Sequence, residues 1–267
     1  MTTFGFIGTG NMAGALVRAA CKTLNPAQIL LANRTPAKAQ ALADELGCVF
    51  SDNQTVAQQA DYIFLGVKPQ MMAGLLDSLR ATLAQRKRRF ILVNMAAGLS
   101  IADIQSLAGG DYPVLRIMPN TPASIGEGII LYTPSENVTD EETAGFVSGM
   151  SKAGRLSALP EHLLDAGSCI SGCGPAFVDL FIEGLADGGV ACGVPRKQAI
   201  EFAAQMVAGA AKLVLETGKH PGELKDAVCS PGGTTIQGVR ELEENGFRAT
   251  AMNAVIAAYD KTVSLMK

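Results

Sequence analysis

Residues 4–14 read Phe-Gly-Phe-Ile-Gly-Thr-Gly-Asn-Met-Ala-Gly, an apolar run that ends in closely spaced glycines and leads into an Ala-rich segment. The apolar run predicts a buried strand, and the Ala-rich segment predicts a helix. Gly8 permits a tight turn, Gly10 lets a ligand approach the backbone, and small Ala13 lets the helix lie close to the strand. An ordinary βα turn could carry two glycines, but strand, loop and helix together favour a dinucleotide site. The predicted cofactor-binding residues here are Gly8, Thr9, Gly10, Asn11 and Met12.

The first half of the chain alternates short apolar runs with helical patterns, which is typical of a doubly wound α/β sheet. Several runs are apolar throughout, as expected for parallel strands covered on both faces. A capping box is predicted at Ser100 and Asp103. The predicted strands are Phe4–Ile7, Ile29–Ala32, Cys48–Phe50, Tyr62–Val67, Phe90–Val93, Val114–Ile117 and Ile129–Leu131.

The second half contains no strand pattern, so we predict an α/β domain over residues 1–156 and an all-helical domain over residues 157–267. Helices that are apolar nearly all round should be buried, and a domain this small can bury them against a second copy. The predicted helices are Glu161–Asp165, Pro175–Ala191, Arg196–Glu216, Gly222–Val228, Thr234–Glu244 and Phe247–Met266.

Composition narrows the class of protein. The 267 residues are 48% hydrophobic and 18% charged, which excludes disorder, and the net charge of −3 disfavours nucleic-acid and membrane-surface binding. No leader pattern and no uninterrupted apolar run of membrane-spanning length is found. The six cysteines form no CxxC pair, so neither a metal site nor a disulfide framework is expected. We therefore predict a cytoplasmic protein with free thiols.

The end of the second predicted strand indicates which cofactor is bound. NAD-binding domains place Asp or Glu there to hold the ribose 2′-hydroxyl, whereas this strand is followed by Asn33, Arg34 and Thr35, with Lys38 one turn later. A 2′-phosphate suits a guanidinium and a hydroxyl. NADP(H) is therefore the preferred cofactor and NAD(H) a possible one, although Arg34 could also be a solvated loop residue.

Further loops follow the carboxyl ends of other predicted strands, where ligands bind in open α/β sheets. Each loop taken alone could be an ordinary turn, but they share one edge of the sheet. The residues concerned are Val67, Lys68 and Pro69 after one strand, Ala96, Ala97 and Gly98 after the next, and Asn120 in the Met118–Pro122 loop.

A second candidate site lies at Ser230-Pro-Gly-Gly-Thr-Thr235. Thr234 with Gln237 resembles a capping box, so a helix should begin here. Gly232 and Gly233 leave backbone N–H groups uncovered, and with the helix dipole behind them these groups could bind a small carboxylate. The alternative is a helix–helix turn with a good cap.

Taken together, these motifs resemble the pyrroline-5-carboxylate reductase family over essentially the whole chain. The resemblance rests on Gly5–Met12, Val67–Pro69, Ala96–Gly98, Met118–Pro122, Ser171–Ala176 and Asp226–Gln237, in family order, with Cys173 where the family has serine. It implies a Rossmann-type domain followed by a helical dimerisation domain, and a homodimer that can assemble further. It also implies reduction of 1-pyrroline-5-carboxylate to proline with NAD(P)H, the last step of proline biosynthesis.

The resemblance also implies roles for individual residues. Asn53, with the Val67–Pro69 and Ala96–Gly98 loops, would contact the cofactor. The substrate would be held by Ser230, Gly232, Gly233, Thr234 and Thr235, with Glu161 nearby. Thr235 would be the catalytic residue: its hydroxyl is too weak an acid to be the sole proton source, so it would hydrogen-bond the ring nitrogen while solvent or a protonated imine supplies the proton.

Three other functions are compatible with part of the pattern. A β-hydroxyacid dehydrogenase would need a catalytic lysine on the long helix, and no lysine lies between Pro175 and Val194. A ketol-acid reductoisomerase would need magnesium, for which the spacing of Asp179, Glu183 and Asp187 is permissive only. A non-catalytic NADP(H) sensor would have no use for an anion site at Gly232–Thr235.

Overall fold

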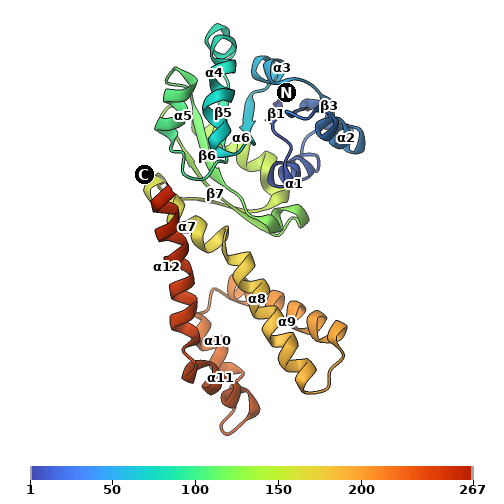
Figure 1. The fold of residues 1–267 in the computed structure, drawn as a ribbon, viewed down its shortest axis with the longest axis vertical. Coiled ribbons are helices and arrows are strands. Elements are labelled where there is room, and N and C mark those ends of the chain that lie inside the picture. The colour runs from blue at the N-terminus through green and yellow to red at the C-terminus, as the bar shows by residue number, and fades with distance from the viewer. Residues whose placement is uncertain (1, 266–267) are drawn as a thin grey trace. The chain divides into compact units, whose positions relative to one another are not determined.

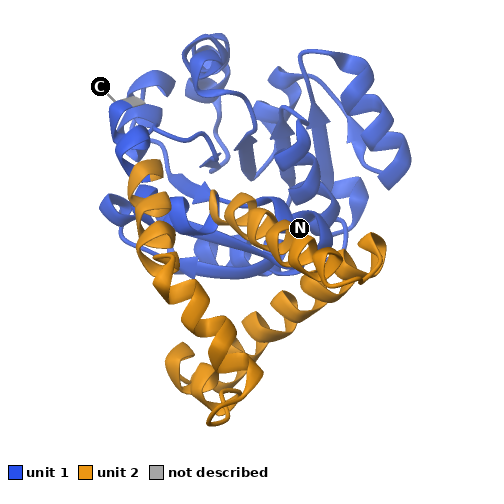
Figure 2. Ribbon diagram, turned by 60° about the horizontal axis from the view of Figure 1, so that its bottom comes forward, with its two compact units in different colours: residues 1–172, 259–267 blue, residues 173–258 orange. Residues whose placement is uncertain are grey.

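The computed structural model describes residues 2–265. The chain folds into two compact units, residues 1–172 with 259–267 and residues 173–258 (Figure 2). We call them the sheet unit and the helical unit. The domain limits predicted from the sequence, 1–156 and 157–267, stay a prediction.

The sheet unit contains an eight-stranded, mostly parallel sheet in the order β3-β2-β1-β4-β5-β6-β7-β8, with only the β6–β7 pair antiparallel. Phe4 of β1 pairs with Ile29 of β2 on one side and with Tyr62 of β4 on the other, so the strand before the Gly8–Met12 loop lies inside the sheet. The predicted α/β class is confirmed. The strands are β1 Phe4–Ile7, β2 Ile29–Ala32, β3 Val49–Phe50, β4 Tyr62–Leu65, β5 Ile91–Asn94, β6 Val114–Met118, β7 Gly128–Pro134 and β8 Gly154–Ala158.

The predicted and observed strands differ mainly at β4, β7 and β8. β7 runs over Gly128–Pro134 rather than Ile129–Leu131, and the bounds of β1, β2, β3, β5 and β6 agree with the prediction within one residue. β4 ends at Leu65 rather than Val67, because Gly66 turns the chain toward β1 and its N–H donates to the Ile7 carbonyl at 2.8 Å. β8 was not predicted, because its sequence Gly-Arg-Leu-Ser-Ala has no apolar run and lies half-exposed at the sheet edge.

Helices cover the sheet, as the ribbon in Figure 1 shows. The capping box at Ser100 and Asp103 is confirmed. These helices are α1 Asn11–Ala20, α2 Pro36–Leu46, α3 Asn53–Gln59, α4 Pro69–Gln85, α5 Ile101–Ala108, α6 Asp140–Met150 and α7 Glu161–Ser171, with short 3-10 turns at Pro26–Gln28, Thr121–Ile125 and Ser151–Ala153.

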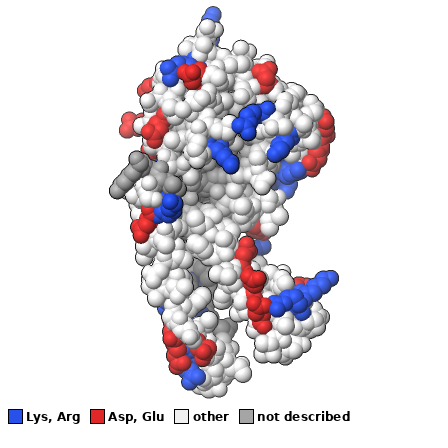
Figure 3. All heavy atoms as spheres, in the orientation of Figure 1, with Lys and Arg blue, Asp and Glu red and all other residues white. Residues whose placement is uncertain are grey.

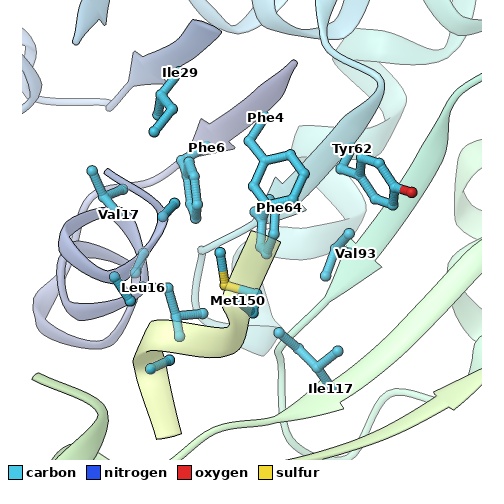
Figure 4. Packing of buried hydrophobic residues seen from close by; sticks show 14 of the residues in the cluster. Phe4, Phe6, Leu16, Val17, Ile29, Tyr62, Phe64, Val93, Ile117 and Met150 are labelled. Carbon is cyan, nitrogen blue, oxygen red and sulfur yellow. The ribbon is translucent and has the colours of Figure 1, made fainter. Parts of the chain in front are cut away.

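Two clusters of buried apolar side chains pack against the sheet. In one of them, Phe4 and Phe6 of β1 pack with Phe64 of β4, and the Phe6 and Phe64 rings stack with centroids 4.2 Å apart (Figure 4). On β1, Ile7 belongs to the other cluster. A strand buried on both faces is rigid, so it fixes the position of the loop that follows it.

The helical unit buries little of its own apolar surface. Its buried apolar residues, among those described, are Ala186, Ala199 and Ala203, while Leu180 and Leu215 are each more than 60% exposed. In Figure 3 the middle of α12 (Phe247–Leu265) shows almost no charged side chain on the face in view. The unit is built from α8 Gly174–Ala191, α9 Arg196–Thr217, α10 Pro221–Ala227, α11 Thr234–Glu244 and most of α12 Phe247–Leu265.

One helical stretch among the described residues, Glu161–Ala191, is long and apolar enough to cross a membrane by length and composition alone. It is interrupted by the turn at Gly172 and Cys173 and carries Asp165 and Asp179. Apolar helical surface of this kind also suits association with a second copy of the chain.

Candidate functional site

Two glycines position the loop after β1. Gly8 has φ +98°, and a Cβ built on it would lie 2.4 Å from the Gly66 carbonyl oxygen after β4. A Cβ on Gly66 would in turn lie 2.6 Å from the Gly8 carbonyl oxygen. The two loops therefore approach each other at a distance that only glycine permits. The sequence reasoning singled out Gly8 but missed Gly66, whose role depends on a contact 58 positions away.

The start of α1 is open toward a ligand. Gly10 is the N-cap and no side chain caps the helix, so the first backbone N–H groups have no side-chain acceptor. A Cβ on Gly10 would meet nothing within 4 Å. The Thr9 hydroxyl is buried and has no hydrogen-bond partner among the described residues. Uncapped N–H groups and an unpartnered hydroxyl at a helix N-terminus fit the pyrophosphate of a dinucleotide.

Asn33 ties the α1 loop to the end of β2. Its Oδ1 accepts from the Thr9 N–H at 3.1 Å, and its Nδ2 donates to the Thr35 carbonyl at 3.0 Å. The amide therefore holds the loop before α2 against the loop before α1. Both helices begin at this point, so their N-terminal dipoles face the same region.

A cavity of about 760 Å³ opens at these loops. Three cations line it: Arg34 and Lys38 near the start of α2 and Lys68 at the start of α4. None of the three takes part in an ion pair among residues 2–265. The exposed Arg34 guanidinium donates a hydrogen bond to the Met71 sulfur, at 3.8 Å. Cations without carboxylate partners beside a cavity of this size fit a phosphorylated dinucleotide.

The structure brings about half of the predicted cofactor residues to this one cavity. Thr9 lies in the loop before α1, where its N–H donates to Asn33. Asn11, Met12 and Pro69 lie in the first turns of α1 and α4. The predicted residues that line the cavity are Gly8, Gly10, Asn33, Arg34, Thr35, Asn53, Val67 and Lys68.

The remaining predicted cofactor residues follow the next two strands. The Ala96–Gly98 loop is shaped by Asn94, a buried residue just before it to which the sequence analysis assigned no role: its Oδ1 accepts from the Ala96 N–H, and its Nδ2 donates to the Leu99 carbonyl, both at 2.9 Å. Asn120 uses both ends of its amide within the fold, accepting from Ile129 N–H and donating to the Ser171 carbonyl. A polar residue that ends an otherwise apolar strand is the signal that could have pointed to Asn94.

Glu161 lies at the start of α7, against the sheet. Its carboxylate accepts from the Ile101 N–H at 2.7 Å and lies 3.5 Å from the buried Arg116 guanidinium on β6. Arg116 also forms a 2.6 Å ion pair with Asp165, one turn further along α7. The three side chains fasten α7 to β6 and satisfy the first N–H of α5. One third of the Glu161 side chain remains exposed.

The Ser230–Thr235 segment forms the start of α11 in the helical unit. Gly232 has φ +70°, the Gly233 N–H donates to the Ser230 carbonyl at 3.0 Å, and a Cβ on Gly233 would lie 2.3 Å from the Ser230 hydroxyl. The predicted capping box of Thr234 with Gln237 is wrong, because Gly233 is the N-cap and no side chain caps the helix. The first N–H groups of α11 are therefore left for an external acceptor, which suits a carboxylate.

Comparison with known proteins gives two matching family models. Residues 161–265 match the model for pyrroline-5-carboxylate reductase dimerisation, and residues 3–98 match that for the coenzyme F420-dependent NADP oxidoreductases. Pyrroline-5-carboxylate reductases from Escherichia coli K12 and Arabidopsis thaliana are each 42% identical to the chain, over 98% of its length and over 98% and 94% of their own.

Solved structures agree in fold over the full length. A pyrroline-5-carboxylate reductase from Coxiella burnetii superposes with a TM-score of 0.92 at 29% identity, covering 100% of this chain and 99% of that one. The Plasmodium falciparum pyrroline carboxylate reductase, solved with NADP bound, gives 0.87 at 29% identity, with 100% and 98% covered. A ketol-acid reductoisomerase at 13% identity and a TM-score of 0.64 shares the fold alone. Identity above 40% along almost the whole chain, joined to the two sites described above, shows that the chain belongs to the pyrroline-5-carboxylate reductase family.

Proposed function

We propose that this chain reduces the cyclic imine 1-pyrroline-5-carboxylate to proline, using NADPH in preference to NADH. Its family consists of NAD(P)H-dependent oxidoreductases of proline biosynthesis. The observation that carries the proposal is that one chain, matched end to end by such reductases, has both a cation-lined dinucleotide cavity and an uncapped Ser-Pro-Gly-Gly-Thr-Thr helix start.

The sheet unit would hold the cofactor. Backbone N–H groups of Gly8–Met12 would bind the pyrophosphate, and Arg34 with Thr35 would bind the 2′-phosphate. Asn53 and Val67–Pro69 would border the adenosine half. The Ala96–Gly98 loop, together with Asn120, would border the nicotinamide half, which supplies a hydride when it is bound and reduced. NADP in the Plasmodium relative supports this cofactor.

The helical unit would hold the substrate. The N–H groups of Gly232–Thr235 would bind the substrate carboxylate at the start of α11, with the Ser230 hydroxyl beside it. The Thr235 hydroxyl would donate a hydrogen bond to the ring nitrogen and so orient the imine carbon. A cyclic imine is already electrophilic, and the proton on nitrogen comes from solvent or is present from the outset. The chain therefore contributes mainly alignment, which is a large part of what hydride transfer requires.

Glu161 has one role that its contacts establish and one that is proposed. Its contacts with Ile101 and Arg116 give it a structural one, and the family resemblance gives it an approach to the substrate. The exposed third of its side chain leaves room for the second role, which we keep as a proposal.

A steady-state assay tests the function. We expect NADPH absorbance to fall when 1-pyrroline-5-carboxylate is added, with proline formed in equal amount and with no effect of a chelator. Stoichiometric NADPH binding without turnover would instead favour the sensor, and activity lost on chelation would favour a metal-dependent reductoisomerase. Either result would overturn the proposal.

The family's dimerisation region, residues 161–265, makes the protein a homo-oligomer. We propose a homodimer that can assemble further, located in the cytoplasm, with domains at 1–156 and 157–267. The exposed apolar surface of α8 and α9 supports the assembly. Sedimentation of the purified chain tests it, since a monomer at micromolar concentration would contradict it.

A further inference from the structure

Two cysteines that follow different helices meet at the C-terminal ends of α1 and α2. Cys21 is the C-cap of α1, and Cys48 follows Gly47, the C-cap of α2. Their sulfur atoms lie 3.4 Å apart. A disulfide bond measures about 2.05 Å, so the sulfurs need to approach by only about 1.4 Å to bond. Both thiols are half-buried, which leaves them within reach of small oxidants.

The surrounding contacts hold the two thiols close together. Arg18, one turn before Cys21, forms a bidentate ion pair with Glu45, three residues before Cys48. Gly47 has φ +74°, and the Cys48 N–H donates to the Ala43 carbonyl at 3.0 Å. Two helix ends that are already joined lose little further freedom when their thiols bond.

The two thiols differ in acidity. A hydrogen bond from the Cys48 S–H lowers the pKa of Cys21, and the Arg18 guanidinium lowers it further, against the opposing effect of burial. The pKa of Cys48 is raised, chiefly because its proton is held in that hydrogen bond. The thiolate is the nucleophile in disulfide chemistry, so Cys21 should react first.

We propose that Cys21 and Cys48 are a redox modification site, at which a low-molecular-weight disulfide converts the two thiols reversibly into an intramolecular disulfide. The Cys21 thiolate attacks one sulfur of the oxidant and expels a thiolate, forming a mixed disulfide. The Cys48 thiol then gives up its proton to solvent, attacks the Cys21 sulfur and expels the second thiolate. One oxidant disulfide is reduced to two thiols for each protein disulfide formed. In a reducing cytoplasm such a bond would be transient and responsive to oxidation.

Oxidised glutathione is the probe. After treatment of the whole purified protein, we expect two of the six thiols to be lost and recovered with dithiothreitol. Trypsin should release the peptides 19–22 and 39–80 as one linked species. Closing this loop restricts the unfolded chain, so the oxidised form should melt roughly 5–10 °C higher than the reduced form.

Single variants identify the order of attack. Cys48→Ser should stop at a glutathione adduct on Cys21, Cys21→Ser should leave Cys48 unmodified, and neither should show the rise in melting temperature. Cys192→Ser, at an exposed cysteine, is the matched control and should behave as the wild type. The proposal fails if all six wild-type thiols survive excess oxidised glutathione, or if the linked peptides join other cysteines. Peptide mapping needs no variant, so the test stands even if one variant folds poorly.

Discussion

Replacing Arg34 by alanine should shift cofactor preference from NADPH toward NADH. Arg34 lines the cavity, hydrogen-bonds the Met71 sulfur and has no carboxylate partner among the described residues, so its charge is available for a 2′-phosphate. A hydrogen bond to a charged group contributes about 1.5–3 kcal/mol. Arg34 is exposed to solvent, which favours the lower end of that range. We therefore expect kcat/KM for NADPH to fall about 10- to 30-fold, since each 1.4 kcal/mol is a factor of ten.

The assay compares kcat/KM for NADPH and NADH at saturating imine. NADH lacks the 2′-phosphate, so its kcat/KM should change less than about twofold. Lys38 should preserve part of the NADPH preference, and Arg34→Ala combined with Lys38→Ala should remove it. Arg155→Ala, an exposed arginine on β8 outside the cavity, is the matched control. Equal losses with both cofactors, or no loss with either, would refute the 2′-phosphate assignment.

Three further predictions concern other parts of the chain. Arg116→Leu should lower the free energy of unfolding by about 3–5 kcal/mol, because it leaves the Asp165 carboxylate largely buried without its cation; chemical denaturation measures this, and a loss under about 1 kcal/mol would contradict it. Thr235→Val should reduce kcat/KM for the imine about 5- to 150-fold, a loss of about 1–3 kcal/mol in transition-state stabilisation, with the KM for NADPH unchanged, and full activity would remove Thr235 from the mechanism. A hydrogen bond from Arg89 lowers the pKa of Glu142, so the stability from this pair is present above about pH 4.3 and is lost as pH falls further. Glu142→Gln should therefore flatten the acid side of a plot of melting temperature against pH, and an unchanged slope there would refute the coupling.

Local rules predicted the features that depend on neighbours in sequence. Gly8 needs a positive φ because of the turn it makes, and Ser100 caps α5 through a residue three positions away. The bounds of α11, Thr234–Glu244, are confirmed because Gly233 before it and Asn245 after it both interrupt a helix. Such signals lie within a single turn of chain, so the sequence displays them directly.

Most of the features that were missed depend on distant partners. Gly66 matters because it touches Gly8, 58 positions away. Asn94 is the exception, because its partners Ala96 and Leu99 are two and five residues away and a polar residue at the end of an apolar strand could have pointed to it. Arg116 is an unremarkable cation in the sequence, and only the packing of α7 on β6 reveals it as the buried anchor for Asp165. For the same reason, a resemblance to a family could suggest a role for Glu161 but could not show that its carboxylate also satisfies the start of α5.

The few buried alanines of α8 and α9 have a consequence for how this protein denatures. In the proposed homodimer a second copy would cover the apolar faces of this unit, which would then have no fixed melting point of its own, because mass action sets the fraction that is folded. Dilution alone should therefore loosen α8 and α9, while the sheet with its internal aromatic core keeps its melting temperature. At low protein concentration, the amount of active enzyme would then be limited by how often two copies meet rather than by the chemistry of the site.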